Sequence, residues 1–270
     1  MYPPYCTVTD ISERVSLIPS TEFDAERLAE LSKLAFDTDV EIGAPSKGGP
    51  PGYDDHEWQT RAMKIMDYYC ILLDDSIVGG VIVCLGGEEH KILERIFVDP
   101  EHHNRGIGAR AMVLTMGQYP VVKVWTLGAP EWNERTSHFY EKLGFIQVGW
   151  DNADPKFRGR WHQKILDPSY RPLKVEELRD GMGNVTVEGE ILEKSHARVV
   201  RSRRRYWERL SVADAGFGDD TGRLVLTLWN NQIKMVSVGD HIRVENGYVG
   251  SYRGVKQLST GKAGRIIHLI

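Results

Sequence analysis

The sequence predicts an α/β domain followed by a small all-β domain. Up to about residue 167, apolar strand-like runs alternate with stretches whose apolar residues recur at helical spacing. From Val185 onward the period becomes two, and glycine-containing turns separate short runs. The part from Pro172 onward holds 16 Lys and Arg against 12 Asp and Glu, and the part before it holds 18 against 26. These balances of +4 and −8 predict two domains with different partners.

Composition is ordinary for a globular protein of 270 residues. No apolar run approaches the ~18 residues of a membrane helix. The first five residues, Met1 to Tyr5, lack the basic start and the apolar core of a signal peptide. The three cysteines (Cys6, Cys70 and Cys84) are too far apart to suggest a disulfide framework or a zinc site. A cytoplasmic protein is therefore expected.

The first elements follow from apolar spacing. The expected order is a strand at 15–18, a helix that carries Ala25, Leu28, Leu31, Leu34 and Ala35 on one face, a helix at 55–67, and strands at 69–73 and 77–85. Ser20, Thr21 and Asp24 offer N-caps for the first helix, and Asp74–Ser76 is typical of a hairpin turn. The glycine- and proline-rich stretch 43–52 is predicted to be a loop, either functional or a mobile surface segment.

The stretch from Lys91 to Phe145 organises the rest of the domain. An apolar strand at 91–98 and an Asp99-Pro100 turn precede the run His103-Asn104-Arg105-Gly106-Ile107-Gly108, which opens a helix. Glycines let the main chain approach a ligand, and the free N–H groups of a first helical turn attract an anion. A strand at 121–127 and a helix at 133–143 follow, and strands at 145–148 and 161–166 complete the expected sheet.

Two motifs in this stretch resemble those of the GNAT superfamily of N-acetyltransferases. The run from His103 to Gly108 resembles the Q/R-x-x-G-x-G/A pyrophosphate loop, although His103 replaces Gln or Arg. Asn133, Tyr140 and Gly144-Phe145 resemble the second half-motif, with Thr136 where Ala is common. The resemblance covers about residues 12–167. It implies a mixed, mostly antiparallel sheet with flanking helices, and acetyl-CoA as the acetyl donor.

The resemblance also implies roles for individual residues. The backbone amides of Arg105, Gly106, Ile107, Gly108 and Ala109 would hold the pyrophosphate, and His103 and Asn104 would also belong to the cofactor-binding loop. The main chain of Ile96, Phe97 and Val98 would pair with the pantetheine arm. Tyr140 would be the general acid, with packing on the sheet as the alternative. Asn133 would orient the cofactor or only cap its helix.

The general base is the least defined part of this site. Glu94 is the candidate, because several members of the family carry a catalytic glutamate on this strand. Asp99, His90 and His102 are the alternatives. No metal is expected, since no third ligand stands at a convincing spacing from the adjacent histidines at 102 and 103.

The C-terminal part is predicted to form five short strands and a small closed barrel. The strands are marked by Val185 to Ile191, by Leu210 and Val212, by Leu224 to Leu228, by Ile242 and Val244, and by Leu258 and Ile266. Turns are expected at Gly239-Asp240, Asn246-Gly247 and Arg253-Gly254. The phrases around 184–191, 220–230 and 238–248 resemble the OB-fold of archaeal single-strand-binding proteins of the replication protein A type. The domains are therefore placed at 1–167 and 173–270, joined by a linker at 168–172.

A basic and aromatic cluster lies between the first two strands of this barrel. Six arginines fall between His196 and Arg209. Arginines neutralise phosphates, and aromatic rings stack on bases at roughly 1–3 kcal/mol each. The candidate nucleic-acid residues are Arg201, Arg203, Arg204, Arg205, Tyr206, Trp207, Trp229, Tyr248 and Tyr252. Alternatively, the arginines form a solvated loop or contact the acidic first domain, and the tryptophans are core residues.

These observations favour an acetyl-CoA-dependent N-acetyltransferase whose acceptor is an amine, either of a protein or of a small molecule. Its OB-fold would hold single-stranded DNA or RNA, or a partner bound to nucleic acid. A second hypothesis is a non-catalytic acetyl-CoA sensor that modulates the barrel. A third is that the barrel is purely structural.

Overall fold

The computed structural model describes residues 14–84, 87–154, 157–201, 207, 209–260 and 264–270. By packing, the chain forms two units that interleave along the sequence. The first unit comprises Met1–Leu85, Ile92–Val122 and Trp132–Gly144, and the second comprises Gly86–Lys91, Lys123–Glu131 and Phe145–Ile270. Packing therefore groups the last strands of the predicted first domain with the C-terminal part. The domain limits 1–167 and 173–270 stay a prediction.

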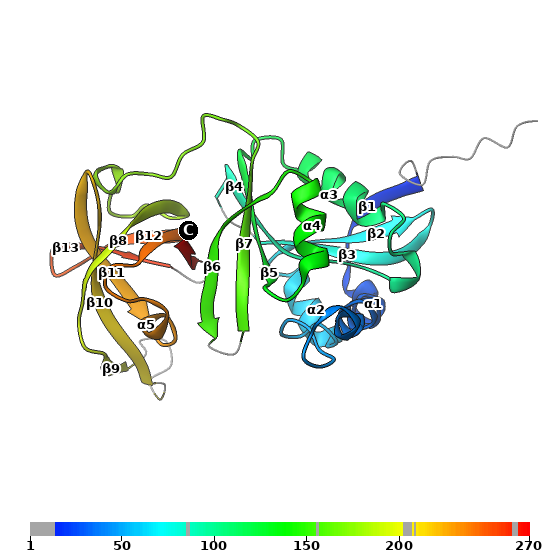
Figure 1. The fold of residues 1–270 in the computed structure, drawn as a ribbon, viewed down its shortest axis with the longest axis horizontal. Helices are drawn as coiled ribbons and strands as arrows, with labels where there is room; N and C mark the ends of the chain where they lie inside the picture. The colour runs from blue at the N-terminus through cyan, green and yellow to red at the C-terminus, as the bar shows by residue number, and fades with distance from the viewer. Residues whose placement is uncertain (1–13, 85–86, 155–156, 202–206, 208, 261–263) are drawn as a thin grey trace, which may run out of the picture. The chain divides into compact units, whose positions relative to one another are not determined.

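The first unit contains an antiparallel sheet (Figure 1). Its strands pair in the order β1 (Val15–Pro19), β2 (Asp67–Leu73), β3 (Ser76–Cys84) and β4 (His90–Val98), with the first two residues of β4 in the second unit. The pairing of β3 with β4 is irregular at one place, because Ile82 pairs with Arg95 and Val83 with Leu93. Glu94 is therefore the extra residue of a β-bulge.

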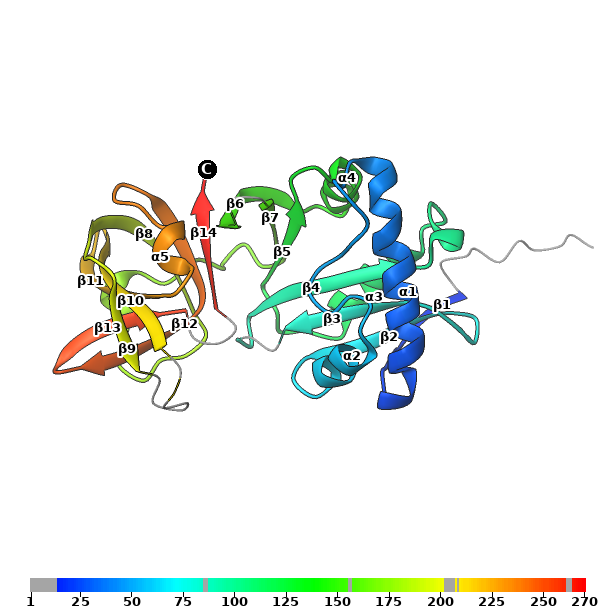
Figure 2. The same cartoon turned by 90° about the horizontal axis from the view of Figure 1, so that it is seen from below.

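Two helices cover one face of this sheet, α1 (Ala25–Asp37) and α2 (His56–Met63), and Figure 2 shows α1 crossing the strands. The core under them contains buried side chains of α1, α2, β2, β3 and β4: Leu28, Leu31, Ala35, Ala62, Tyr68, Cys70, Ile82 and Phe97. α3 (Ile107–Gly117) lies near Val98, the residue after Phe97 on β4. A Cβ on Gly108 would be 3.9 Å from Val98 Cγ2. Side chains alternate along a strand, so α3 lies on the other face.

Local sequence accounts for the helix ends. Thr21 and Asp24 form the capping box of the turn that leads into α1, and the Asp55 carboxylate accepts a hydrogen bond from Glu57 N at the start of α2. α2 ends at Met63, earlier than predicted, because β2 already begins at Asp67. Leu34 is 50% exposed and does not belong to the buried face of α1, contrary to the sequence prediction.

The remaining short elements of this unit are α4 (Glu134–Lys142) and the 3₁₀ turns η2 (Glu22–Asp24), η3 (Thr38–Ile42) and η4 (Pro100–His102). The loop after η3 contains neither helix nor strand between residues 43 and 52, as predicted. Within the parts of the chain that the structure describes, no helix is long and apolar enough to cross a membrane.

The second unit joins two sets of strands. β5 (Val124–Pro130), β7 (Phe157–Ile165) and β6 (Ile146–Asp154) pair in that order, all antiparallel. β14 (Arg265–Leu269) then pairs antiparallel with β6, through His268 with Trp150 and Leu269 with Gly149. The C-terminal strand is therefore part of the same sheet as β5–β7.

The strands of the C-terminal part pair in a ring. The pairings run from β8 (Val185–Lys194) to β10 (Arg209–Asp219), β11 (Gly222–Trp229), β13 (Val255–Ser259) and β12 (His241–Tyr252), and β12 pairs again with β8. The helical segments are η5 (Val175–Glu177) and α5 (Gln232–Met235). The core consists of inward side chains of this ring, among them Val187, Ile191, Phe217, Leu226, Ile242, Val249 and Leu258.

Three sequence predictions for this part need correction. Leu258 and Ile266 belong to separate strands, β13 and β14, because β13 ends at Ser259 and β14 begins at Arg265. A short strand, β9 (Arg198–Arg201), lies within the arginine-rich stretch and pairs with β10. Asn246-Gly247 is not a hairpin turn. Asn246 has a φ of 50°, and the register of β12 shifts there, so the same left-handed residue forms a bulge inside one strand.

Candidate functional site

The turn between β4 and α3 has the geometry of an anion-binding turn. Asn104 and Gly106 adopt left-handed φ angles of 59° and 80°, and α3 begins directly after Gly106. A Cβ placed on Gly106 would meet nothing within 4 Å, so this position faces open space. The left-handed conformation of Gly106 is one that glycine adopts more easily than any other residue.

α3 differs from α2 and α4 at its N-terminus. α2 and α4 each have a side-chain cap, from Asp55 and Asn133, whereas the N-cap of α3 is Gly106, which has no side chain to accept a hydrogen bond. The first turn of α3 contains no acidic residue either. The first N–H groups of a helix have no partner within the helix, and they carry the positive end of its dipole. An uncapped, open N-terminus is suited to a phosphate group.

Side chains fix the turn against the end of β4. His103 Nε2 donates a hydrogen bond to the Val98 carbonyl at 2.8 Å, and Asp99 Oδ1 accepts one from Glu101 N at 3.0 Å. Burial lowers the pKa of His103, so the ring is held neutral with its proton on Nε2. Arg105 Nη1 lies 2.9 Å from His102 Nδ1. The turn is therefore preorganised without its ligand.

The predicted pantetheine strand lies directly before this turn. Ile96 is half-buried, and Phe97 and Val98 are buried. Phe97 points into the core beneath α1 and α2, and the Val98 carbonyl already accepts from His103. Pairing of this main chain with pantetheine stays a prediction.

Tyr140 and Asn133 lie at the two ends of α4. Tyr140 is buried, and burial raises the pKa of its hydroxyl well above the usual range, so the hydroxyl keeps its proton at neutral pH. Asn133 caps the helix, since its Oδ1 accepts a hydrogen bond from Thr136 N at 2.9 Å. The capping role is thus observed, and a role of Asn133 in orienting a cofactor stays a prediction.

Glu94 is half-buried at the bulge of β4. Its Oε2 accepts a hydrogen bond from Cys84 Sγ at 3.4 Å. Cys84 is two residues from Ile82 on β3, and Ile82 belongs to the core under α1 and α2. Because residues i and i+2 share a face of a strand, the Glu94 carboxylate also lies on the α1–α2 face.

The alternative bases are engaged elsewhere. Asp99 caps η4, and His102 contacts Arg105. His90 is buried in the second unit, where Nε2 lies 2.6 Å from Thr126 Oγ1 and Nδ1 lies 3.0 Å from Thr186 Oγ1.

Glu245 completes this buried group. Its Oε2 lies 3.7 Å from His90 Nε2, and its Oε1 lies 3.6 Å from Arg243 Nη1. Burial lowers the pKa of His90 to about 3, and the positive charges of Arg243 and Arg265 lower it further. Burial raises the pKa of Glu245 to about 7, although the same two arginines oppose this rise. The neutral form of each group is therefore favoured.

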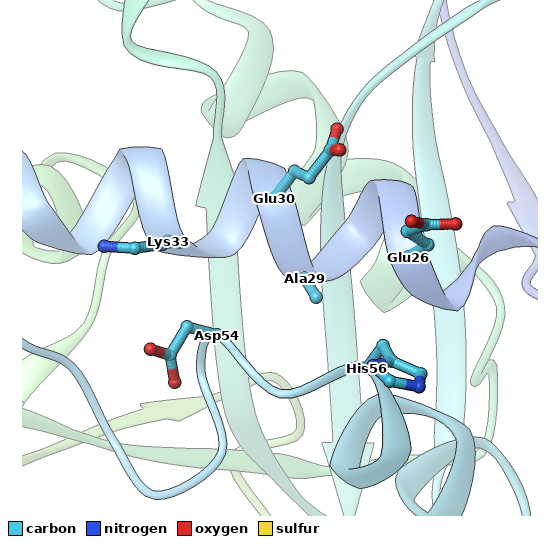
Figure 3. A pocket seen from close by; sticks show the side chains of 6 residues that line it. All are labelled: Glu26, Ala29, Glu30, Lys33, Asp54 and His56. Atoms are coloured by element: carbon cyan, nitrogen blue, oxygen red, sulfur yellow. The ribbon is translucent and has the colours of Figure 1, made fainter.

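A pocket of about 190 Å³ opens on the α1–α2 layer (Figure 3). Figure 3 shows side chains of α1 on one side of it, and on the other side Asp54 from the segment before α2 and His56 at the start of α2. Its lining residues are Glu26, Ala29, Glu30, Lys33, Asp54 and His56. Three carboxylates against one lysine give this surface a negative potential, which attracts cations.

The candidate nucleic-acid residues fall into three groups. Trp229, Tyr248 and Tyr252 are 37%, 50% and 48% exposed, and Trp207 is 82% exposed. Arg201 is exposed on β9. Arg203, Arg204, Arg205 and Tyr206 lie outside the described residues.

The strand register places three of the aromatic residues on one face. Tyr248 and Tyr252 alternate with buried Val249, and Trp229 alternates with buried Leu228, so all three project outward from the ring. β13 links their strands, since Gln257 pairs with Gly250 on one side and Val225 on the other.

Arg201 is not brought to this face. Trp229 pairs with Val212, and Arg201 pairs with Arg209, three residues before Val212, so the register places Arg201 on the opposite side of β10. Sequence reasoning overlooked Gln257 and Ser259 on the outward face. The alternation around Leu258 could have revealed them.

Comparisons with known proteins match two parts of the chain. The model of the acetyltransferase (GNAT) domain matches residues 66–147, and that of the OB fold of Ssb-like single-stranded DNA binding proteins matches residues 183–268. The chain carries a GNAT domain and an Ssb-like OB fold. The resemblance and the fold class predicted from the sequence are thus confirmed.

Individual relatives match one part each. The single-stranded DNA binding protein Ssb of Saccharolobus solfataricus is 31% identical over 93 residues, covering 34% of this chain and 61% of the relative. The uncharacterized protein YrkN of Bacillus subtilis is 33% identical over 122 residues, covering 42% of this chain and 66% of the relative. The matches thus span less than two thirds of these relatives. An acetyltransferase structure from Thermus thermophilus is 20% identical, with a TM-score of 0.47, covering 56% of this chain and 97% of the other.

Proposed function

We propose that the protein is an acetyl-CoA-dependent N-acetyltransferase whose OB fold holds single-stranded nucleic acid or a partner bound to it. The observation that supports this most is the open, uncapped N-terminus of α3, which follows Gly106 within the region that matches a GNAT domain. Five consecutive backbone N–H groups, of residues 105–109, are available to hold the pyrophosphate of the cofactor.

The cofactor would supply an acetyl group activated as a thioester. Transfer forms a C–N bond to the amine and breaks the C–S bond, and the nitrogen loses a proton while the sulfur gains one. Glu94 takes the proton from the amine, because its carboxylate lies at the bulge of β4 on the α1–α2 face. A lysine amine needs this help, since its pKa of about 10.4 keeps it protonated at pH 7.

Tyr140 donates a proton to the departing sulfur. Its hydroxyl is buried and stays protonated at neutral pH. The burial that keeps the proton on the tyrosine also disfavours a free thiolate, so donation is coupled to departure. The backbone N–H groups of the turn and the tyrosine thus act at the two ends of the leaving group.

The test is transfer of labelled acetyl from acetyl-CoA to fractionated amines and proteins, with wild type and Tyr140→Phe. We expect Tyr140→Phe to lower kcat about 10²- to 10⁴-fold, the usual contribution of a general acid, and to leave acetyl-CoA binding unchanged. The control is Gly117→Ala at the end of α3, where a Cβ meets nothing within 4 Å. If wild type binds acetyl-CoA but acetylates nothing, the sensor hypothesis replaces the enzyme.

The outward face with Trp229, Tyr248 and Tyr252 is proposed to bind bases by stacking. Fluorescence anisotropy with an oligothymidylate of about 12 nucleotides measures this. Trp229→Ala should weaken binding about 5- to 150-fold, the loss of one stacked base. Phe23→Ala is the control, because Phe23 is an aromatic residue, 90% exposed, in the first unit. Equal weakening by both variants, or no binding at low salt, would contradict the assignment.

A further inference from the structure

Arg95 is a buried cation that forms no ion pair among the described residues. It lies on β4 directly after Glu94, and it is only 4% exposed. Its Nη2 donates to the Pro51 carbonyl at 3.2 Å, whereas Nε and Nη1 are buried and have no hydrogen-bond partner among the described residues. No ion pair involving Arg95 occurs in the described part of the chain. Buried guanidinium groups are normally paired, because an uncompensated charge is costly to bury.

Aromatic rings surround the guanidinium instead. Its Cζ lies 4.4 Å from the centroid of the Trp58 ring and 5.9 Å from that of Phe36. The Phe36 ring in turn contacts Tyr53, edge to face, at 6.1 Å. These rings hold the cation in place by cation–π attraction, and they leave the hydrogen-bond donors of Nε and Nη1 unused. Burial lowers the pKa of Arg95, although nearby Glu94 and Tyr68 oppose this.

The loop at 43–52 covers the aromatic cage that Phe36 and Trp58 form around the Arg95 guanidinium. Gly52 has a φ of 73°, and a Cβ there would lie 2.1 Å from Trp58 Cγ. A Cβ on Gly49 would lie 2.6 Å from Tyr53 Cγ. The loop therefore rests on the same rings that frame the guanidinium, and exposed Pro51 contacts the cation itself. The loop is thus the part of the chain that covers Arg95 on the side of Pro51.

The bulge brings Arg95 and Glu94 to the same face of the sheet. Arg95 pairs with Ile82 and so shares its α1–α2 face. The Glu94 carboxylate reaches that face too, through Cys84. In a regular strand, consecutive side chains would point to opposite faces. Here one positive and one negative group lie next to each other on the same face of the sheet.

We propose that Arg95 binds the carboxylate of the acetyl acceptor, and that this acceptor is an amino acid or a similar small amine that carries a carboxylate. The inference rests on the proposed acetyltransferase function. The neighbouring charges complement a zwitterion, with Glu94 facing the ammonium group and Arg95 the carboxylate. A single guanidinium neutralises one carboxylate, whereas a phosphate dianion would leave a buried charge unpaired.

Acceptor pairs that differ only in the carboxylate test this inference. Thiol release from acetyl-CoA would be measured with L-amino acids and their carboxamides, and with O-phosphoethanolamine and ethanolamine. For wild type we expect the free acids to exceed the amides about 10- to 100-fold in kcat/KM, as expected for a hydrogen bond to a charged group. Arg95→Met should abolish this preference by lowering activity on the acids alone, and Arg95→Lys should retain part of it. The exposed Arg61→Met on α2 is the matched control.

Two results would overturn the inference. One is a wild type that acetylates amides as well as acids, which needs no variant and so stands even if Arg95→Met fails to fold. The other is an Arg95→Met variant that loses activity on acids and amides alike, as a purely structural arginine would. A larger preference for O-phosphoethanolamine over ethanolamine would assign the site to phosphate and overturn it also. If no amine is acetylated, the proposed function fails, and calorimetric titration with the same amino acids and amides decides whether Arg95 binds carboxylates.

Discussion

Replacing Glu245 by Gln should change how the stability of the second unit depends on pH. Glu245 is fully buried, and its pKa is raised from 4.5 to about 7 in the folded protein. Between these two values the folded state holds a proton that the unfolded state has lost, so the free energy of unfolding of wild type falls as pH rises. The contribution is fully present below pH 4.5 and is lost as pH passes about 7. Gln cannot titrate and lacks this slope.

The magnitude follows from the shift. About 2.5 pH units at 1.36 kcal/mol each give about 3 kcal/mol. Relative to wild type, the free energy of unfolding of Glu245→Gln should therefore rise by about 3 kcal/mol between pH 4.5 and pH 8, whatever constant offset the amide introduces. His90 contributes with the opposite sign, because its pKa is lowered to about 3 and its neutral form is favoured. It is present in both proteins, so its effect largely cancels in the difference.

Urea unfolding followed by circular dichroism at several pH values measures this difference. Glu190→Gln is the control, since Glu190 has a 45% exposed side chain on neighbouring β8 and no buried partner is disturbed. A wild-type-to-variant difference that stays constant within about 0.5 kcal/mol from pH 4.5 to pH 8 would refute the reasoning. So would a change of the opposite sign.

Three further substitutions test the packing. Gly149→Ala places a Cβ 2.1 Å from a backbone carbonyl of β14, so the pairing of β14 with β6 should be lost and the melting temperature should fall, unlike in Gly117→Ala. Asn133→Ala removes the cap of α4 and should cost about 1 kcal/mol in chemical unfolding, whereas Asn133→Ser should restore most of it. Gly52→Ala forces the loop off Trp58, and faster quenching of tryptophan fluorescence by acrylamide should report the exposed ring.

Local features were predictable from the sequence because a few adjacent residues determine them. The glycine turn before α3 and the Asn133 cap need only their own neighbours. The left-handed conformation of Asn246 was also predictable, but such a residue occurs both in hairpin turns and in β-bulges. Asn246 forms a bulge because β12 pairs with β8 on both sides of it, and distant residues determine this pairing.

Contacts between distant segments could not be predicted in this way. In the sequence, nothing distinguishes Arg95 from the other charged residues of its apolar strand. Its cage depends on Phe36 and Trp58, which reach it only when α1 and α2 pack on the sheet. The same holds for His90 and Glu245, which lie far apart in the chain and meet in one buried group.

The pairing of β14 with β6 has a kinetic consequence. Trp150 and Gly149 receive their partners, His268 and Leu269, only after all of β8 to β13 has been synthesised. Contacts between residues so far apart in sequence form slowly, because a long loop must close first. Until then β6 is an unprotected edge, and such edges pair readily with other chains. The edge of β6 is therefore exposed to other chains while the protein is being made, and this exposure ends only when β14 pairs with it.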